Sequence, residues 1–491
     1  MAIGQRQRAL GVGVGAGLLV ALAVGNACGE TLADALALAY QTNPTLQAQR
    51  ASQRALDETY VQARAGYNPT ASVQATVTTD SNNETFSTGV TSIPGQSQTS
   101  AATLTIIQPI YTGGLVSSQV NAADGDVQAG REGLRQVEQA VLQTVIGAYV
   151  DVRRDQENLA IAQQNVTVLG RELDEAQARF QVGEITRTDV AQTQARLAAG
   201  QAQLASAQAQ LTVSRANYAA VVGQNPADLA PEPSLAKLLP ATVDQAFDGA
   251  EHNNPQIRQA DYAEQAAAAR VAAAKAQTRP TLALRAGAGY QGGNLGLASP
   301  FANYTHDVNA SAVLTIPLFT GGLTSSEIRQ AAERDNVARI NVEVVRRQIL
   351  QQLAQAWSQL LGARANLVAN EEQVRATAIA FDGTSQEAQV GLRTTLDVLN
   401  AEQELRNAQL ALVNARHDEY VAATAVLTAM GALHVEDLTT GVAAYDPKVN
   451  FDHVRHSFGW IPWTPAVAAI DRLGAPTIIT APAAVSGPPG P

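Results

Sequence analysis

Side chains that could carry acid–base or metal chemistry are scattered thinly along this chain of 491 residues. Of its six histidines, only His453 and His456 lie close enough in the sequence to share a metal ion. Asp452 is an acidic neighbour but no cysteine is near, so we interpret the two histidines as a surface loop pair rather than as a metal site. Serine, histidine and aspartate residues form no recognisable triad spacing. We therefore expect no catalytic residue, no bound metal and no cofactor.

Two aspartates stand out by their spacing from a threonine. Asp189 lies three residues after Thr186, and Asp397 lies three residues after Thr394. This Thr-x-x-acid pattern is typical of a capping box, in which two side chains satisfy backbone N–H groups at the start of a helix. From the residues alone, we interpret both aspartates first as helix caps.

The elements that hold these residues come from a duplicated sequence. The motif at residues 108–114 recurs at residues 316–322, an offset of 208 positions, and other anchors keep the same offset: Val182-Gly183 with Val390-Gly391, and Asp189-Val190 with Asp397-Val398. Internal repetition of this kind decides the architecture before any local pattern does. We predict two structural repeats, residues 30–224 and 244–431, joined by a linker at residues 225–243.

Each repeat is predicted to begin with a helix and to continue as a β-hairpin. Asn43-Pro44 and Asn254-Pro255 mark the helix starts, because asparagine caps a helix and proline suits its first position. The hydrophobic period then changes from 3.6 to 2, which predicts hairpins at residues 70–109 and 281–317 with strands of about ten residues.

Each hairpin is followed by a long helical stretch without proline, at residues 114–222 and 322–430. Apolar residues recur every seven positions in the second part of both stretches: Val190, Leu197, Leu204, Leu211 and Tyr218 in one, and Ala401, Ala408, Ala415, Ala422 and Ala429 in the other. Heptads predict coiled-coil packing. We expect two helical hairpins whose tips are the Val-Gly elements, with two short helices placed end to end along each long one.

The first 29 residues predict that the chain is exported from the cytoplasm. Residues 1–29 have the basic, apolar and small-residue parts of a secretory signal peptide, and the only cysteine, Cys28, lies within them; lipidation of Cys28 is the alternative. After residue 29 no run of 18 apolar residues occurs, so we expect no membrane-spanning helix. A formal net charge of −11 argues against nucleic acid as a partner.

Strands of about ten residues are long enough to cross a bilayer at a tilt. An open sheet of four strands cannot do so, because every backbone polar group must be paired in lipid. Two copies of the chain would supply eight strands and three would supply twelve, and a passage favours the larger number. A soluble sheet that caps a coiled coil is the alternative.

The duplicated plan, the paired Pro-x-x-Thr-Gly-Gly turns and the tip at residues 390–399 resemble the TolC family of outer-membrane export ducts over roughly residues 30–440. The resemblance implies an α+β membrane protein of a Gram-negative bacterium. Three chains would form a twelve-stranded outer-membrane β-barrel and a periplasmic α-helical coiled-coil barrel. The linker and residues 432–491 would form an equatorial segment, ending in a disordered tail.

The resemblance also implies partners. Members dock on a periplasmic adaptor protein that is driven by an inner-membrane ABC or proton-driven transporter, and they conduct cargo passively rather than act as enzymes. The cargo is either a secreted protein or small toxic compounds. A periplasmic coiled-coil adaptor without its own pore is the rival interpretation, but adaptors normally have one helical hairpin and not a duplicated unit.

Family positions map onto two groups of residues in this sequence. The adaptor-docking tips map to Val182, Gly183, Val390, Gly391 and Leu392, and Glu184 stands where the first tip often has an apolar residue. The pore constriction maps to Asp397 and Asn400, one turn apart, and the gate links map to Arg393 with Thr188 and Asp189. The resemblance therefore favours a pore role for Asp397, which is compatible with its capping role.

Overall fold

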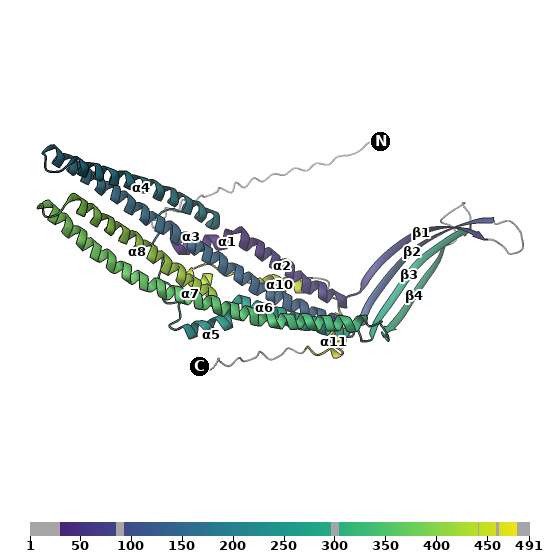
Figure 1. The fold of residues 1–491 in the computed structure, drawn as a ribbon. Coiled ribbons are helices and arrows are strands. Elements are labelled where there is room, and N and C mark those ends of the chain that lie inside the picture. The colour runs from purple at the N-terminus through teal and green to yellow at the C-terminus, as the bar shows by residue number, and fades with distance from the viewer. Residues whose placement is uncertain (1–29, 85–92, 296–303, 440, 458–460, 479–491) are drawn as a thin grey trace, which may run out of the picture.

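The structure is a computed structural model, and it describes residues 30–84, 93–295, 304–439, 441–457 and 461–478. The chain is strongly elongated, with a four-stranded sheet at one end and two helical hairpins at the other (Figure 1). The predicted signal peptide at residues 1–29, with Cys28, lies outside the described residues, as does the end of the predicted tail at residues 479–491.

The helices that open the two repeats begin where their caps predict. Helix α2 (Pro44–Arg64) starts after Asn43, whose Oδ1 accepts from the backbone N–H of Thr45 at 3.0 Å. Helix α6 (Pro255–Ala276) starts after Asn254 in the same way. A shorter helix that the sequence analysis did not predict precedes each of them: α1 (Leu32–Thr42) and α5 (Val243–Asn253).

The two hairpins join into one antiparallel sheet with the order β1-β2-β3-β4. The strands are β1 (Thr70–Glu84), β2 (Ile93–Tyr111), β3 (Thr281–Leu295) and β4 (Tyr304–Thr315), and β2 pairs with β3 across the repeats. At 12 to 19 residues they are longer than the ten predicted. The alternation of apolar residues stops early, but the backbone ladder continues through polar residues such as Ser81 paired with Gln96.

Helices α3 (Leu115–Gln181) and α7 (Leu323–Gln389) each contain 67 residues, or roughly 100 Å of helix. Each starts after a glycine in the left-handed region, Gly114 with φ 85° and Gly322 with φ 84°. They return as α4 (Arg187–Val222) and α8 (Thr395–Met430), 36 residues each. None of the described helices combines the length and the apolar character needed to cross a membrane.

Two short helices lie end to end along each long one, as predicted. Helices α4 and α2 pack on α3, and α8 and α6 pack on α7 (Figure 1). Small residues let the backbones approach closely, since a Cβ added at Gly125 of α3 would lie 3.0 Å from Ala266 of α6. Leu211 and Tyr218 of one heptad series and Ala408 and Ala415 of the other are buried, which confirms coiled-coil packing.

The largest hydrophobic core lies at the middle of the rod, where the linker between the repeats returns to the helices. Tyr149 and Tyr218 are fully buried there. The Tyr149 hydroxyl lies 2.5 Å from the carbonyl oxygen of Ala230 in the linker, and the backbones of Glu30 and Leu229 form a β-bridge. These contacts fix the linker against α3.

The described part of the C-terminal segment contains three more helices, α9 (Val435–Leu438), α10 (Pro447–Ser457) and α11 (Thr464–Leu473). Helix α10 packs along α2 and includes His453 and His456, which therefore belong to a helix and not to the loop we predicted. Helix α11 reaches the junction of the sheet with α3, where Nε1 of Trp463 donates to Oε1 of Gln108 at 2.9 Å.

Candidate functional site

The two helical tips, at the end of the rod opposite the sheet, have the same backbone. Helix α3 ends at Gln181 and α7 ends at Gln389, and each is followed by valine and then by glycine. Gly183 has φ 82° and Gly391 has φ 80°, a region that L side chains adopt at a cost of roughly 1–2 kcal/mol. The glycines therefore make both tight reversals possible.

The predicted docking residues are the most prominent apolar side chains of the tips. Val182 and Val390 are each 71% exposed, and Leu392 is 76% exposed. Among the described residues, and apart from the two chain neighbours of each glycine, no atom lies within 4 Å of a Cβ added at Gly183 or Gly391. Apolar groups held on a rigid turn and open to solvent are suited to contact with another protein.

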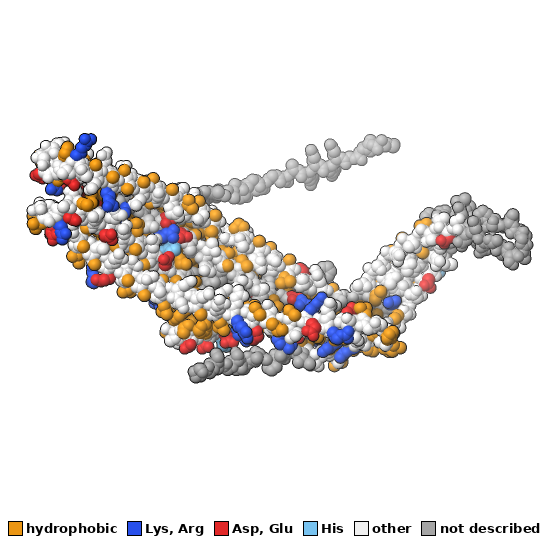
Figure 2. Space-filling view, viewed as in Figure 1, with side chains coloured by type: hydrophobic (Ala, Val, Ile, Leu, Met, Phe, Trp, Pro, Cys, Tyr) orange, Lys and Arg blue, Asp and Glu red, His pale blue; other side chains and the backbone are white. Residues whose placement is uncertain are grey.

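An ion pair closes each tip, and the equivalent positions 179 and 387 carry opposite charges. Arg179 Nε lies 3.3 Å from Glu184 Oε2 at the first tip, and Arg393 Nε lies 2.9 Å from Glu387 Oε2 at the second. Arg179 and Glu387 are equivalent positions of the two repeats. Side chains of both signs are visible at this end of the molecule (Figure 2). The two tips therefore differ in charge pattern and in the apolar Leu392, which replaces Glu184.

Both predicted capping boxes are confirmed. Asp189 accepts from the backbone N–H and the hydroxyl of Thr186 at 2.9 and 2.8 Å, and Asp397 accepts from those of Thr394 at 3.0 and 2.8 Å. These hydrogen bonds lower the pKa of each carboxyl below its ordinary value. Both aspartates consequently stay ionised into acidic solution.

The remaining predicted site residues are near the same end but make separate contacts. Asn400 is exposed on α8, and its Oδ1 accepts from Nη2 of Arg196 on α4 at 3.1 Å. Thr188 is exposed at the start of α4. Within one chain Arg393 pairs with Glu387 of its own hairpin, so a gate link from Arg393 to Thr188 or Asp189 remains a prediction.

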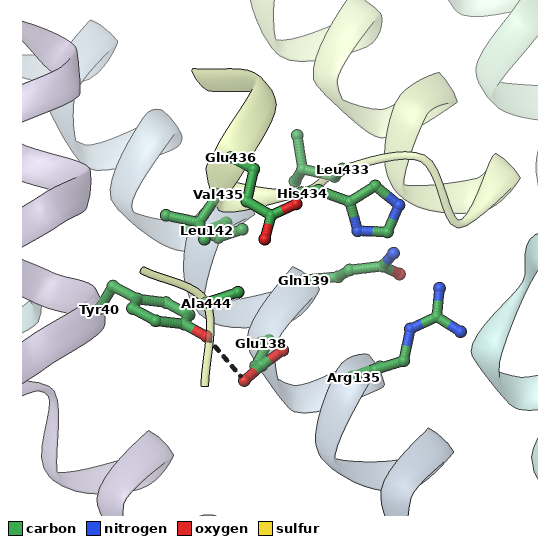
Figure 3. A pocket seen from close by; sticks show the side chains of 10 residues that line it. All are labelled: Tyr40, Arg135, Glu138, Gln139, Leu142, Leu433, His434, Val435, Glu436 and Ala444. Atoms are coloured by element: carbon green, nitrogen blue, oxygen red, sulfur yellow. Dashed lines mark hydrogen bonds between the residues drawn. The ribbon is translucent and has the colours of Figure 1, made fainter. Parts of the chain in front are cut away.

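A polar cavity of about 170 Å³ lies near the middle of the rod, between α1, α3 and α9 (Figure 3). The Tyr40 hydroxyl donates to Glu138 Oε1 at 3.2 Å, and burial raises the pKa of Glu138. Among the described residues no group of three His, Cys, Asp or Glu side chains is arranged to hold a metal. Acidic and basic groups share the lining of this cavity.

Sequence reasoning missed a buried carboxylate at the other end of the rod. Asp471 of α11 is fully buried, and its Oδ1 accepts from the backbone N–H of Thr112 at 2.7 Å and of Gly114 at 3.1 Å. It also accepts from the N–H of Ser117 at 3.3 Å. The carboxylate thus fixes the turn that connects the sheet to α3. No short motif signals a contact between residues so far apart in the sequence.

The profile of the family described as outer membrane efflux protein matches two stretches of the chain, residues 35–224 and 247–432. These matches cover most of the chain and coincide with the two repeats. The chain belongs to the outer membrane efflux protein family.

Two relatives agree with this assignment to the outer membrane efflux proteins, and a solved structure shares the fold. The chain is 36% identical to outer membrane efflux protein BepC of Brucella suis biovar 1 over 87% of this chain and 91% of BepC. It is 27% identical to the alkaline protease secretion protein AprF of Pseudomonas aeruginosa over 62% of this chain and 64% of AprF. The outer membrane protein VceC of Vibrio cholerae has the same fold, with a TM-score of 0.68, 24% identity, and coverage of 82% of this chain and 96% of VceC.

The family assignment confirms the expected class of function and location. Like other outer membrane efflux proteins, the chain is an export duct of the Gram-negative outer membrane with a periplasmic extension. The duplication, the four strands in each chain and the long helical hairpins are also confirmed.

Proposed function

We propose that three copies of the chain close into a twelve-stranded outer-membrane β-barrel that continues as a periplasmic tunnel of helices. The observation that supports this most strongly is the open sheet. Within the described part of one chain, β1 and β4 each pair with a single strand, so their outer edges are left for another strand. In lipid such edges must be paired, and pairing β1 of one copy with β4 of the next closes the sheet without a free edge.

The side chains of the sheet support a lipid-facing surface. Val73, Val77 and Val308 are 73%, 63% and 78% exposed in the single chain, and they recur at even spacing along β1 and β4. Apolar side chains of that exposure on one face of a strand suit contact with acyl chains. Exposure of the same apolar side chains to water would be unfavourable in free energy.

The helical tips are proposed as the docking surface for a periplasmic adaptor protein. Val182 and Val390, on the left-handed turns at Gly183 and Gly391, with Leu392 beside them, offer an apolar contact at the far end of the tunnel. The adaptor would connect the duct to an inner-membrane ABC or proton-driven transporter. The energy would come from that transporter, and the chain would be a passive conduit and not an enzyme.

Asp397 and Asn400 are proposed to line the constriction at the tip end of the tunnel. Three Asp397 carboxylates around a narrow opening would favour cations. Thr188, Asp189 and Arg393 are proposed to form links between neighbouring hairpins in the closed state. Such a link would require Arg393 to exchange its present partner, Glu387.

The proposed cargo is either a secreted protein or small toxic compounds, because relatives of both kinds are similar to this chain: BepC is named as an efflux protein and AprF as a protease secretion protein. Deletion of the gene followed by assay of secreted proteins and of sensitivity to toxic compounds separates the two. If the deletion strain loses neither activity, the proposed conduit is contradicted.

The assembly is tested by native mass spectrometry of the full-length mature protein in detergent. We expect the mass of three chains. A stable monomer with the full β-sheet signal in circular dichroism would show that the four strands do not need partners, and would favour the rival interpretation of an adaptor without its own pore.

A further inference from the structure

The two helical hairpins of one chain contact each other mainly through α3 of the first and α8 of the second. One polar contact between these two helices is direct. Nε2 of His417 on α8 lies 3.0 Å from Oδ1 of Asp151 on α3, and the imidazole is only 15% exposed. Any separation of the two hairpins at this level must break this contact.

The other ring nitrogen of His417 also faces a carboxylate, since Nδ1 lies 2.9 Å from Oδ1 of Asp418. With acceptors on both sides, the ring is best satisfied when both nitrogens carry a proton. Burial alone would lower the pKa of His417, but the hydrogen bonds to Asp151 and Asp418 outweigh it and raise the pKa above its ordinary value. The hydrogen bond from His417 in turn lowers the pKa of Asp151.

The surrounding charges connect this contact to the other helices. Arg154 of α3 pairs with Asp151 and with Asp155, both at 2.9 Å, and Nε2 of Gln210 on α4 donates to Asp155 at 3.4 Å. On the far side of α8, Glu419 pairs with Arg364 of α7 at 3.3 Å. His417 therefore joins this polar network of the first hairpin to the second hairpin. Nearer the tip, Arg196 with Asn400 and Arg406 with Gln203 form further hydrogen bonds between the hairpins.

A second titrating group lies four helical turns closer to the tip on the same helix. Glu402 of α8 is only 7% exposed, and its Oε1 has no hydrogen-bond partner among the residues that the structure describes. Burial and the nearby carboxyl of Glu172 on α3 raise the pKa of Glu402 to about 7, against the opposing effect of Arg406 on α8 and Arg196 on α4. Beside α3 the neutral form of Glu402 is therefore favoured more than that of an ordinary glutamate.

Both groups act in the same direction as pH rises. His417 has a raised pKa, so its ion pair with Asp151 is present at lower pH and is lost as pH rises through that pKa. Asp151 has a lowered pKa and remains ionised throughout this range. Glu402 also loses its proton on going to higher pH, which places a second negative charge beside Glu172 in a poorly solvated position.

We propose that the interface between α3 and α8 is a proton-dependent clamp that holds the two hairpins together through His417 and Asp151 and through the neutral carboxyl of Glu402 beside Glu172. Loss of the two protons weakens the clamp and lets the second hairpin move away from the first. The clamp rests on the proposed function, because its opening would widen the tip end of the same duct.

Two measurements on the full-length trimer test the clamp. The first is single-channel conductance in a planar bilayer between about pH 6 and about pH 9, the range in which histidine and a raised carboxyl titrate. The second is the distance between spin labels at Ala176→Cys and Ala388→Cys in a Cys28→Ser background, measured by electron paramagnetic resonance. These alanines line one small cavity between the two tips. We expect both conductance and distance to increase as pH rises.

Two neutral substitutions should have opposite effects. His417→Gln removes the charge at every pH, so conductance and distance should be high already at about pH 6. Glu402→Gln imitates the protonated carboxyl, so the increase should shift to higher pH and become smaller. His417→Arg keeps the positive charge and should keep the clamp closed. His252→Gln is the matched control, because His252 is exposed on α5 and contacts the carbonyl oxygen of Asp248.

The outcomes separate the clamp from the proposed function. A distance that does not change with pH in the wild type, or a normal pH response in both His417→Gln and Glu402→Gln, overturns the clamp while leaving the duct intact. Trimers that form no channel at any pH contradict the proposed function instead, and the distance between the labels still decides whether the hairpins separate.

Discussion

Arg196 of α4 donates through Nη2 to Oδ1 of Asn400 on α8, over 3.1 Å. The two residues come from different hairpins, and Arg196 also contacts Gln403 on the next turn of α8. A guanidinium group thus lies beside one of the two residues proposed for the constriction. At the proposed constriction, the field would be set by this arginine together with Asp397, and not by the acidic residue alone.

The charge of Asp397 is expected to set cation selectivity. Asp397→Asn should shift the reversal potential in a salt gradient toward zero, because the ring of three carboxylates is lost while the amide oxygen can still accept at the cap. Thr394→Ala is the matched control, since it removes the hydroxyl that bonds Asp397 and keeps the charge. An unchanged potential in Asp397→Asn would mean that the residue is only a helix cap.

The hydrogen bonds between Thr394 and Asp397 predict that cation selectivity depends on pH. The hydrogen bonds from Thr394 lower the pKa of Asp397 from 3.8, so the charge and the selectivity are present above the lowered pKa and are lost only as pH falls through it. In Thr394→Ala the loss of selectivity should move to higher pH. The check is the reversal potential during an acid titration of both proteins, and identical titration curves would refute it.

Asn400→Asp is expected to raise cation selectivity only modestly. The new carboxylate would lie within ion-pair distance of Arg196, which would offset much of its charge. The double variant Asn400→Asp with Arg196→Gln should be clearly more cation-selective than either single variant. Reversal potentials of the three proteins measure this, and equal effects of Asn400→Asp with and without Arg196 would show that the arginine does not face the opening.

The left-handed turn at the second tip is expected to be necessary for export. Gly391→Val should reduce export strongly while trimers remain in the outer membrane, because a β-branched residue is strained at φ 80° and the turn would change shape. Gly383→Val is the matched control, since Gly383 lies within α7 with nothing within 4 Å of an added Cβ. Normal export by Gly391→Val would remove the tip from the docking surface.

Asp471 is expected to be important for stability rather than for conduction. Asp471→Ala leaves the N–H groups of Thr112, Gly114 and Ser117, the last two buried, without their acceptor, which should lower the free energy of unfolding by roughly 3 kcal/mol. Asp437→Ala, at an exposed position of α9, should change it little. Denaturant unfolding followed by the helical circular dichroism signal gives the comparison, and equal midpoints would contradict the role of Asp471.

Local chemistry is what made much of the fold predictable. Asn43-Pro44 and Asn254-Pro255 determined the starts of α2 and α6, because a cap acts on the two or three residues that follow it. The capping boxes at Asp189 and Asp397 were predictable for the same reason. Heptad repeats predicted the helical hairpins, because all the positions of such a repeat lie within one continuous segment of the sequence.

Contacts between distant segments were not predictable in this way. Asp471 meets Thr112, and His417 meets Asp151, across hundreds of residues, and neither partner lies in a recognisable motif. The strands were predicted too short because their ends are polar, and the backbone ladder carries no sequence signature there. The positions of the gate links depend on neighbouring copies, so they remain predictions.

The duct formed by three copies is tested most directly by conductance. Purified full-length trimers should form discrete, long-lived channels in a planar bilayer, with cation selectivity that falls in Asp397→Asn. A trimer fraction that inserts into lipid but gives no channels, with or without Asp397, would contradict the duct formed by three copies and its proposed constriction.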